Sequence, residues 1–398
     1  MRIIAALAFL FTTAVCSAQT PFEAAQQRLH TTPLESVLEP EVFVPKPPTV
    51  FSADGQRFLC YELLITNMEN ISFRLERVDV YAEGAASVLY EQDRAELKRS
   101  LNHPGWTEAK GQARDAQLLR GGERVVDFIW MALPSGSLPP KTLVHTITLR
   151  RPTSQASITL PAGRVDVTGP AVKIDPPLRG ANWAALNGPS RSSEHRESMD
   201  SFNGQTDFAE RFAIDWVQID KDGQTSRGDR LNLQNYFCYG QPVYAVADAT
   251  VTYVLDGLPN GRPEAHGRPA DPKVPITLDT IAGNHVILDL GGGVYAAYAH
   301  LQPGSIRVKV GDRVKVGDVL GLIGDSGNST EPHLHFQLMD ANSVLGAQGL
   351  PYAFKTFNVR FGSRVVHDDF KTFPLPQLVS HKDEIPLENE IVEFPGAP

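Results

Sequence analysis

The chain has 398 residues, with 37 Lys and Arg against 46 Asp and Glu, and therefore a formal net charge of −9 at pH 7. This length predicts two or three domains, and a hydrophobic fraction of 42% excludes a wholly disordered chain. The acidic balance argues against a nucleic-acid partner, because binding to phosphates requires a dense Lys and Arg surface.

An export signal is predicted at the N-terminus, over residues 1–18. Arg2 supplies the positive start, residues 3–15 are apolar, and Cys16-Ser17-Ala18 offers the small residues of a cleavage site. The triplet before Cys16 is a poor match to a lipid-attachment motif, which disfavours a lipoprotein anchor. No other apolar run approaches the roughly 20 residues that a bilayer span needs. We therefore expect an exported protein, periplasmic or extracellular, without a membrane span.

The first predicted domain is a β-sandwich. Residues 19–48 form a polar, Pro-rich lead-in, and residues 49–164 contain several runs with strand character. Apolar residues alternate with a period of about two in residues 73–80 and 143–149, which indicates strands with one buried face. An immunoglobulin-like sandwich is the fold expected. His145 lies among apolar residues in one of these runs, and we interpret it as a core histidine.

A second β domain is predicted after a linker. Residues 165–201 are rich in Pro, Gly and Asn, which is typical of a linker. Residues 202–373 contain short strand-like segments separated by glycines, as the tight turns of an all-β domain require. Residues 374–398 are Pro-rich and acidic and predict a flexible tail. Cys60 and Cys238 fall in the two different domains, so a disulfide and two buried thiols both stay open.

The strongest chemical signal is the pair His333 and His335. Residues i and i+2 of a strand project from the same face, so both imidazoles enter one small volume. Such a pair is a common device for metal binding or acid–base chemistry. Two further features accompany it, the segment Tyr298-Ala-His300-Leu and the glycine-punctuated stretch 308–324, which repeats the pattern of residues 240–251.

Residues from about 211 to 338 resemble the lysostaphin/LytM-type zinc metallopeptidases, which are built on a duplicated hybrid motif and cut peptides of peptidoglycan. The matching pieces are Ala213-Ile-Asp215, residues 243–251, Gly283-Asn-His-Val286, Tyr298-Ala-His-Leu301, residues 308–324 and Gly327-Asn-Ser-Thr-Glu-Pro-His-Leu-His-Phe336. The resemblance implies a duplicated-hybrid-motif β-sheet domain, a Zn²⁺ cofactor and peptidoglycan peptides as partners. It carries no indication of the oligomeric state.

The resemblance also implies roles for individual residues. That family holds its metal with the His and Asp of a His-x-x-x-Asp motif and with the second His of His-x-His, which makes Asp215 and His335 metal ligands here. The remaining two histidines of the family pattern, His300 and His333, flank the metal and assist catalysis. One ligand does not transfer, because the residue four positions before Asp215 is Arg211, whose protonated guanidinium has no lone pair to donate.

A catalytic zinc normally has three protein ligands and one open position, so a third donor is needed. His195, in the predicted linker, is one candidate, and a surface histidine is its ordinary reading. His285 beside a turn and His266 in a Pro- and Gly-rich insertion compete with it. Arg211 is expected to contact an acidic substrate group or the oxyanion if it lines the cleft, and its alternative is a salt bridge to Asp215.

Two functions follow. The first is an exported zinc metalloendopeptidase that hydrolyses peptide bonds of peptidoglycan, or of similar Gly/Ala-rich peptides, through a zinc-activated water. The alternative, motivated by Arg211, is a catalytically degenerate module that binds cell wall or activates a hydrolase. A lipoyl-type carrier is a minor third reading, since it leaves the histidines unexplained. Serine and thiol hydrolases are disfavoured, because no Gly-x-Ser-x-Gly elbow and no Cys-His signature are present.

Overall fold

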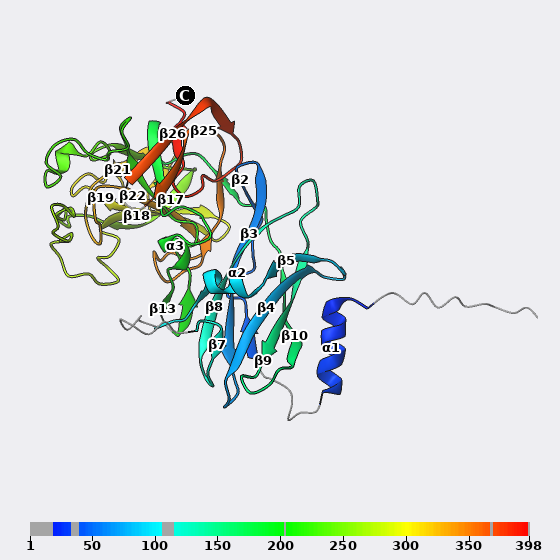
Figure 1. Ribbon diagram of the computed structural model, residues 1–398. Coiled ribbons are helices and arrows are strands. Elements are labelled where there is room, and N and C mark those ends of the chain that lie inside the picture. The colour runs from blue at the N-terminus through cyan, green and yellow to red at the C-terminus, as the bar shows by residue number, and fades with distance from the viewer. Residues whose placement is uncertain (1–18, 33–39, 106–114, 203, 367–368, 397–398) are drawn as a thin grey trace, which may run out of the picture.

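The computed structural model describes residues 19–32, 40–105, 115–202, 204–366 and 369–396 (Figure 1). The predicted signal peptide, with Cys16, lies outside these residues. Helix α1 (Pro21–Thr31) comes first, and its N-cap Thr20 forms a capping box with Glu23. Two β domains follow, and they pack against each other along one face of the first (Figure 1).

The N-terminal domain consists of two facing sheets. One sheet has the order β1 (Pro40–Phe43), β3 (Gln56–Asn67), β8 (Arg124–Ala132), β6 (Leu101–Asn102), with β2 (Phe51–Ala53) on β3. The other has the order β10 (Ser157–Asp166), β9 (Thr142–Arg150), β4 (Phe73–Ala82), β5 (Val88–Gln92), with β7 (Leu118–Leu119) on β4, and α2 (Arg94–Ser100) joins β5 to β6. These are the A-B-E-D and G-F-C-C′ sheets of immunoglobulin domains, so the predicted sandwich is confirmed.

Strand β3 is buried on both of its faces. Leu59 and Leu63 point into the core between the two sandwich sheets. Cys60 points the other way, into a core that it shares with the second domain, and Phe51 on β2 packs edge-on against Phe212 of that domain with ring centroids 5.2 Å apart. A strand covered on both faces needs a continuous apolar run rather than an alternating one, and residues 58–65 supply it, interrupted only by Glu62.

The second domain is built on an eleven-stranded sheet whose pairings are antiparallel. Its order is β20 (Arg313–Val314), β17 (Ala249–Leu255), β18 (Asn284–Gly291), β19 (Val294–Leu301), β22 (Leu334–Met339), β15 (Ile214–Gln218), β12 (Gly180–Leu186), β27 (Ile391–Phe394), β25 (Phe357–Val366), β26 (Asp369–His381), with β23 (Gly349–Leu350) on β22. The short elements around it are the strand pairs β16 (Pro242–Tyr244) with β21 (Val319–Leu322), β13 (Asp200–Phe202) with β14 (Gln205–Asp207) and β11 (Val172–Ile174) with β24 (Tyr352–Phe354), together with helix α3 (Glu194–Glu197) and the 3₁₀ helix η2 (Leu233–Asn235). The predicted all-β class is confirmed.

The boundaries of this domain differ from the prediction at both ends. Strand β12 lies within the predicted linker 165–201, and β27 lies within the predicted flexible tail 374–398, yet the two strands pair with each other inside the main sheet. Both are buried there, with Trp183 and Val392 each at most 1% exposed. The linker and tail predictions are therefore wrong for these segments, because abundant Pro, Gly and acidic neighbours concealed two short apolar runs.

Cys60 and Cys238 are free and buried, so the disulfide alternative is excluded. Burial raises the pKa of the Cys60 thiol to about 11 and that of Cys238 to about 12. Thiols with such values stay protonated and unreactive. Both cysteines act as small apolar side chains of one core.

The buried His145 gives the sandwich a predictable pH dependence. Its Nδ1–H donates to the Gly163 carbonyl oxygen, and its Nε2 lies 2.8 Å from the Tyr61 hydroxyl. Burial lowers the pKa of His145 to about 4, whereas the unfolded chain takes up this proton near pH 6.5. Stability is therefore lost as the pH falls below about 6.5. We expect the stability advantage of wild type over His145→Gln to shrink by about 2 kcal/mol between pH 7.5 and 5, measured by urea unfolding; a constant advantage would contradict it.

Candidate metal centre

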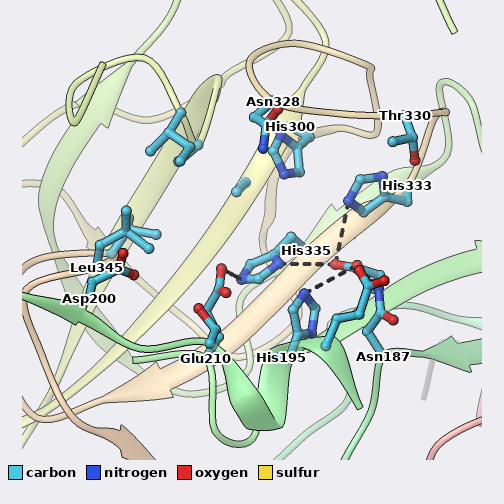
Figure 2. A pocket seen from close by; sticks show the side chains of 17 residues that line it. Asn187, His195, Asp200, Glu210, His300, Asn328, Thr330, His333, His335 and Leu345 are labelled. Atoms are coloured by element: carbon cyan, nitrogen blue, oxygen red, sulfur yellow. Dashed lines mark hydrogen bonds and ion pairs between the residues drawn. The ribbon is translucent and has the colours of Figure 1, made fainter. Parts of the chain in front are cut away.

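A cleft of about 440 Å³ opens beside strands β15, β19 and β22 of the large sheet (Figure 2). Five residues singled out in the sequence line it: His195, Asp215, His300, His333 and His335. All of them are mostly buried, and each histidine is less than 10% exposed. The structure thus gathers into one cavity residues that span 140 positions of the sequence, from 195 to 335.

Sheet register explains how three of these side chains meet. Strands β15 and β22 are antiparallel neighbours, and Asp215 lies directly opposite His335. On the other side of β22, Ala299 of β19 pairs with His335, so that His300 follows at the end of the pairing. His300 has a φ of 61°, which is uncommon for a residue with a side chain and marks local backbone strain. His333 immediately precedes β22 and projects to the same face as His335.

Within the described residues, His195, Asp215 and His335 form a group whose potential ligand atoms all lie within 4.8 Å of one another. The carboxylate is at the centre. Its Oδ2 is 3.3 Å from His195 Nε2, and its Oδ1 is 3.0 Å from His335 Nδ1. His195 comes from α3, outside the large sheet, and Figure 2 shows its ring approaching that of His335. The structure thus places His195 beside Asp215 and His335, and its role as a ligand stays a prediction.

The other nitrogen of each ligand candidate is held by an acceptor. His195 Nδ1–H donates to the Ala213 carbonyl oxygen at 3.3 Å, and His335 Nε2–H donates to Gln337 Oε1 at 2.7 Å. Held in this way, His195 Nε2 and His335 Nδ1 both face the Asp215 carboxylate. Protons join these groups in the metal-free chain, and a bound cation would take the place of those protons. Two imidazole nitrogens and one carboxylate oxygen are a donor set that catalytic zinc uses, so the residues present fit this ion.

His300 and His333 are oriented by the same device. His300 Nδ1–H donates to the Ser326 carbonyl oxygen at 2.7 Å, and His333 Nδ1–H donates to the Glu331 carbonyl oxygen at 2.8 Å. Their Nε2 atoms are left for the cleft, and that of His333 lies 3.4 Å from Asp215 Oδ1. The two rings lie 4.7 Å apart, centroid to centroid. Both can therefore accept or donate a proton beside the group of three.

Burial and charge divide the ionisable groups of the cleft into two kinds. Burial alone would raise the pKa of Asp215, but the neighbouring His195 and His333 hold it well below its usual range. For His195, His333 and His335, burial lowers the pKa, and the carboxylate of Asp215 more than reverses this. For His300, burial and the nearby His333 and His335 outweigh the Ser326 carbonyl and Asp215, and keep its pKa well below its usual range. His300 is consequently neutral near pH 7.

Arg211 does not enter the cleft. Its guanidinium is 3% exposed and pairs with the carboxylate of Glu62 in the sandwich, with Nε–Oε1 and Nε–Oε2 distances of 2.8 and 3.0 Å. The prediction that it contacts substrate or oxyanion is wrong, and so is the alternative of a salt bridge to Asp215. The other donors considered from sequence also lie elsewhere. His285 stacks on Tyr253, and the exposed His266 lies beside Asp229.

Two residues of the site carried little signal in the sequence. Asn187 Nδ2 donates to Asp215 Oδ2 at 2.9 Å, and it comes from the segment assigned to a linker. Gln337 holds His335 and is itself held, because its Nε2 donates to the Val344 carbonyl oxygen at 2.9 Å. Gln337 continues the alternation of His333 and His335 along β22, so strand periodicity could have indicated it.

An antiparallel β domain with a His- and Asp-lined cleft of this kind defines a candidate metallopeptidase. Residues 234–346, which include His300, His333 and His335, match the family model described as Peptidase family M23. Asp215 and His195 precede the matched stretch.

Among curated proteins, the chain is 50% identical over 58 residues to the glycyl-glycine endopeptidase ALE-1 of Staphylococcus capitis, covering 14% of this chain and 16% of that protein. It is 31% identical over 122 residues to the cell division protein DipM of Caulobacter vibrioides, covering 31% and 16%. To the peptidoglycan DD-endopeptidase ShyA of Vibrio cholerae it is 33% identical over 92 residues, covering 23% and 19%. The match thus spans less than a fifth of each of these relatives.

Solved structures similar to this chain include the catalytic domain of lysostaphin from Staphylococcus simulans, with 23% identity, coverage of 42% of this chain and 88% of that one, and a TM-score of 0.24. A putative M23 peptidase from Pseudomonas aeruginosa has 15% identity, coverage of 69% and 82%, and a TM-score of 0.21. These overlays are partial, and the architecture of the chain is defined by its own strand order.

Proposed function

We propose that the protein is an exported zinc metalloendopeptidase that hydrolyses peptide bonds of peptidoglycan, or of similar Gly/Ala-rich peptides. The observation that carries the proposal is the convergence of His195 Nε2 and His335 Nδ1 on the Asp215 carboxylate. The other ring nitrogen of each histidine is hydrogen-bonded to a carbonyl or amide oxygen of the chain. The match to the M23 family model and the peptidase names of two similar proteins, ALE-1 and ShyA, support the reaction and the substrate class. Among the described residues, no helix is long and apolar enough to cross a membrane.

In this proposal His195, Asp215 and His335 hold the ion. When bound, zinc polarises the scissile carbonyl and lowers the pKa of a water toward about 7. The chain supplies the proton transfers. His300 is neutral and buried, so its Nε2 can accept a proton from the attacking water. His333 Nε2 also faces the cleft and can hydrogen-bond to the oxyanion, and the proton taken from the water by His300 can pass to the leaving amine. Asn187 keeps the Asp215 carboxylate oriented.

The direct test is metal dependence of hydrolysis on purified full-length protein. Glycine-rich cross-linked peptidoglycan and isolated peptidoglycan peptides serve as substrates, with product release followed by chromatography. We expect chelation to abolish cleavage and stoichiometric Zn²⁺ to restore it. A protein that binds the same peptidoglycan but cleaves none of it at any zinc concentration would instead be the degenerate binding module that the Arg211 substitution suggests.

His333→Ala separates catalysis from metal binding. Because His333 is outside the group of three, the variant is expected to retain zinc, while hydrolysis falls about 10²- to 10⁴-fold with loss of an acid–base group. Zinc content by atomic absorption and kcat/KM are measured together. His285→Ala is the matched control, since it removes another largely buried histidine from outside the cleft. Loss of zinc in His333→Ala would assign this residue to the ligands instead.

A further inference from the structure

We propose that the N-terminal sandwich is a working part of the metal centre, because Glu62, through Arg196, positions the ligand candidate His195. This inference rests on the proposed function. Glu62 and Arg196 are positioning residues, since neither contacts the cleft. The consequence is that the large sheet alone does not complete the site: two of its three donors belong to that sheet, and the third is held in place from the sandwich.

The helix that carries His195 cannot hold its own position. Helix α3 has only four residues, Glu194–Glu197, which is far shorter than a helix that is stable by itself. Its N-cap Ser193 accepts a hydrogen bond from the Arg196 backbone N–H, which closes the single turn. The location of this turn must therefore come from contacts of its side chains.

Arg196 makes those contacts entirely with the sandwich. Its side chain is 0% exposed. Nη1 donates to Glu62 Oε1, and Nη2 donates to the backbone carbonyl oxygens of Tyr61 at 3.0 Å and Ile129 at 3.2 Å. The guanidinium also lies over the Phe128 ring, 4.7 Å from its centroid. Arg196 is thus fixed on two adjacent strands, β3 and β8, and His195 is the preceding residue of the same turn.

The segment that leads into α3 is tied to the sandwich as well. Arg191, just before α3, forms an ion pair with Glu96 on α2. In Figure 1, α3 lies next to α2 and β8, at the edge of the sandwich that faces the large sheet. The turn is therefore anchored on the sandwich through Arg191 and Arg196, while the His195 ring alone reaches across to Ala213 and Asp215 of the second domain.

Glu62 also forms an ion pair with a second buried cation, Arg211. This carboxylate is 0% exposed and is shared by two guanidiniums, that of Arg196 through Oε1 and that of Arg211 through both oxygens. Arg211 stands where the resembling family has a metal-binding histidine. The same buried carboxylate thus draws Arg211 out of the cleft and holds the turn that brings His195 into it.

The two arginines form a matched pair for the test. Arg196→Met and Arg211→Met each remove one cation from Glu62, but only Arg196 belongs to the turn of His195. Zinc affinity of the full-length proteins is measured by competition with a chromophoric chelator, and the thermal midpoint of each metal-free variant is measured by circular dichroism. We expect both variants to lose thermal stability and only Arg196→Met to lose zinc affinity, by about 10- to 100-fold.

The outcomes are distinct. Unchanged zinc affinity in Arg196→Met, with affinity lost in His195→Ala, would overturn the positioning role and leave the proposed function standing. An equal loss in both arginine variants would mean general destabilisation and would also overturn it. A wild-type protein that binds no zinc would remove the proposed function itself. If Arg196→Met fails to fold, Arg196→Lys, which keeps the cation but not the contacts to both backbone carbonyls, replaces it in the same comparison.

Discussion

His195→Ala is expected to abolish zinc binding and peptide hydrolysis together. The substitution leaves Asp215 and His335 as the only members of the group of three, and two protein ligands hold a zinc ion weakly. We expect the affinity for zinc to fall by more than the roughly 10- to 100-fold that follows loss of an outer hydrogen-bonding partner of a ligand. Zinc content after dialysis and cleavage of peptidoglycan peptides are measured on the same preparation.

The control for this experiment is His266→Ala. His266 was considered as the missing donor from sequence, but it is an exposed histidine whose Nε2 lies 3.4 Å from Asp229. Its removal is expected to leave zinc content and hydrolysis unchanged. Full zinc occupancy in His195→Ala would show that the ion is held without this residue. In that case His195 would not take over the role of the metal-binding histidine that the resembling family has at the position of Arg211.

Glu62→Gln is expected to cause the largest loss of stability of any single polar substitution that we consider. The carboxylate compensates two buried guanidiniums, and its replacement by a neutral amide leaves their charges unpaired. Removing one partner of a buried ion pair typically costs about 3–5 kcal/mol. The free energy of unfolding, measured with urea by far-UV circular dichroism, reports this loss. Glu83→Gln, which breaks an exposed pair with Arg164, is the control that should change little.

The pH dependence of this effect has a defined sign. Burial would raise the pKa of Glu62, but Arg211 and Arg196 outweigh it and lower the pKa below its ordinary value of 4.5. The stabilisation from Glu62 is therefore complete above about pH 4.5 and is lost as the pH falls below it. The difference in the free energy of unfolding between wild type and Glu62→Gln should therefore decrease as the pH falls below about 4.5. A difference that stays constant down to pH 3 would contradict a charged Glu62.

Strands whose own residues alternate in hydrophobicity could be predicted from the sequence. Alternation in β4 and β9 indicated a sandwich, because each of these strands has one face on a single core. The short strands β12 and β27 escaped prediction for a physical reason. Their pairing is with each other and with β15 and β25, and a strand of four to seven residues beside turns has too little pattern of its own.

Some residues of the candidate site could likewise be predicted from local sequence, and others could not. His333 and His335 were predicted because a two-residue spacing on one strand has a direct geometric meaning, and Asp215 followed from the resemblance. His195 was only one of several donors, because its position depends on Arg196 and on Glu62, 134 residues earlier in the chain. Arg211 was misplaced for the same reason, since its partner belongs to another domain. The roles of these residues as zinc ligands stay predictions until the metal is measured.

The pairing of β12 with β27 sets an order of events in folding. Ala184 pairs with Ile391, so this contact closes a loop of about 200 residues, and pairings so distant in sequence form slowly. Strand β15, which carries Asp215, lies between β22 and β12 in the sheet. The edge of β15 away from His335 is covered by β12, where Ala184 pairs with Val217, and β27 adds to the other edge of β12. Asp215 itself meets His335 across 120 positions of the chain, so we infer that the two sheet donors of the zinc site come together late in folding.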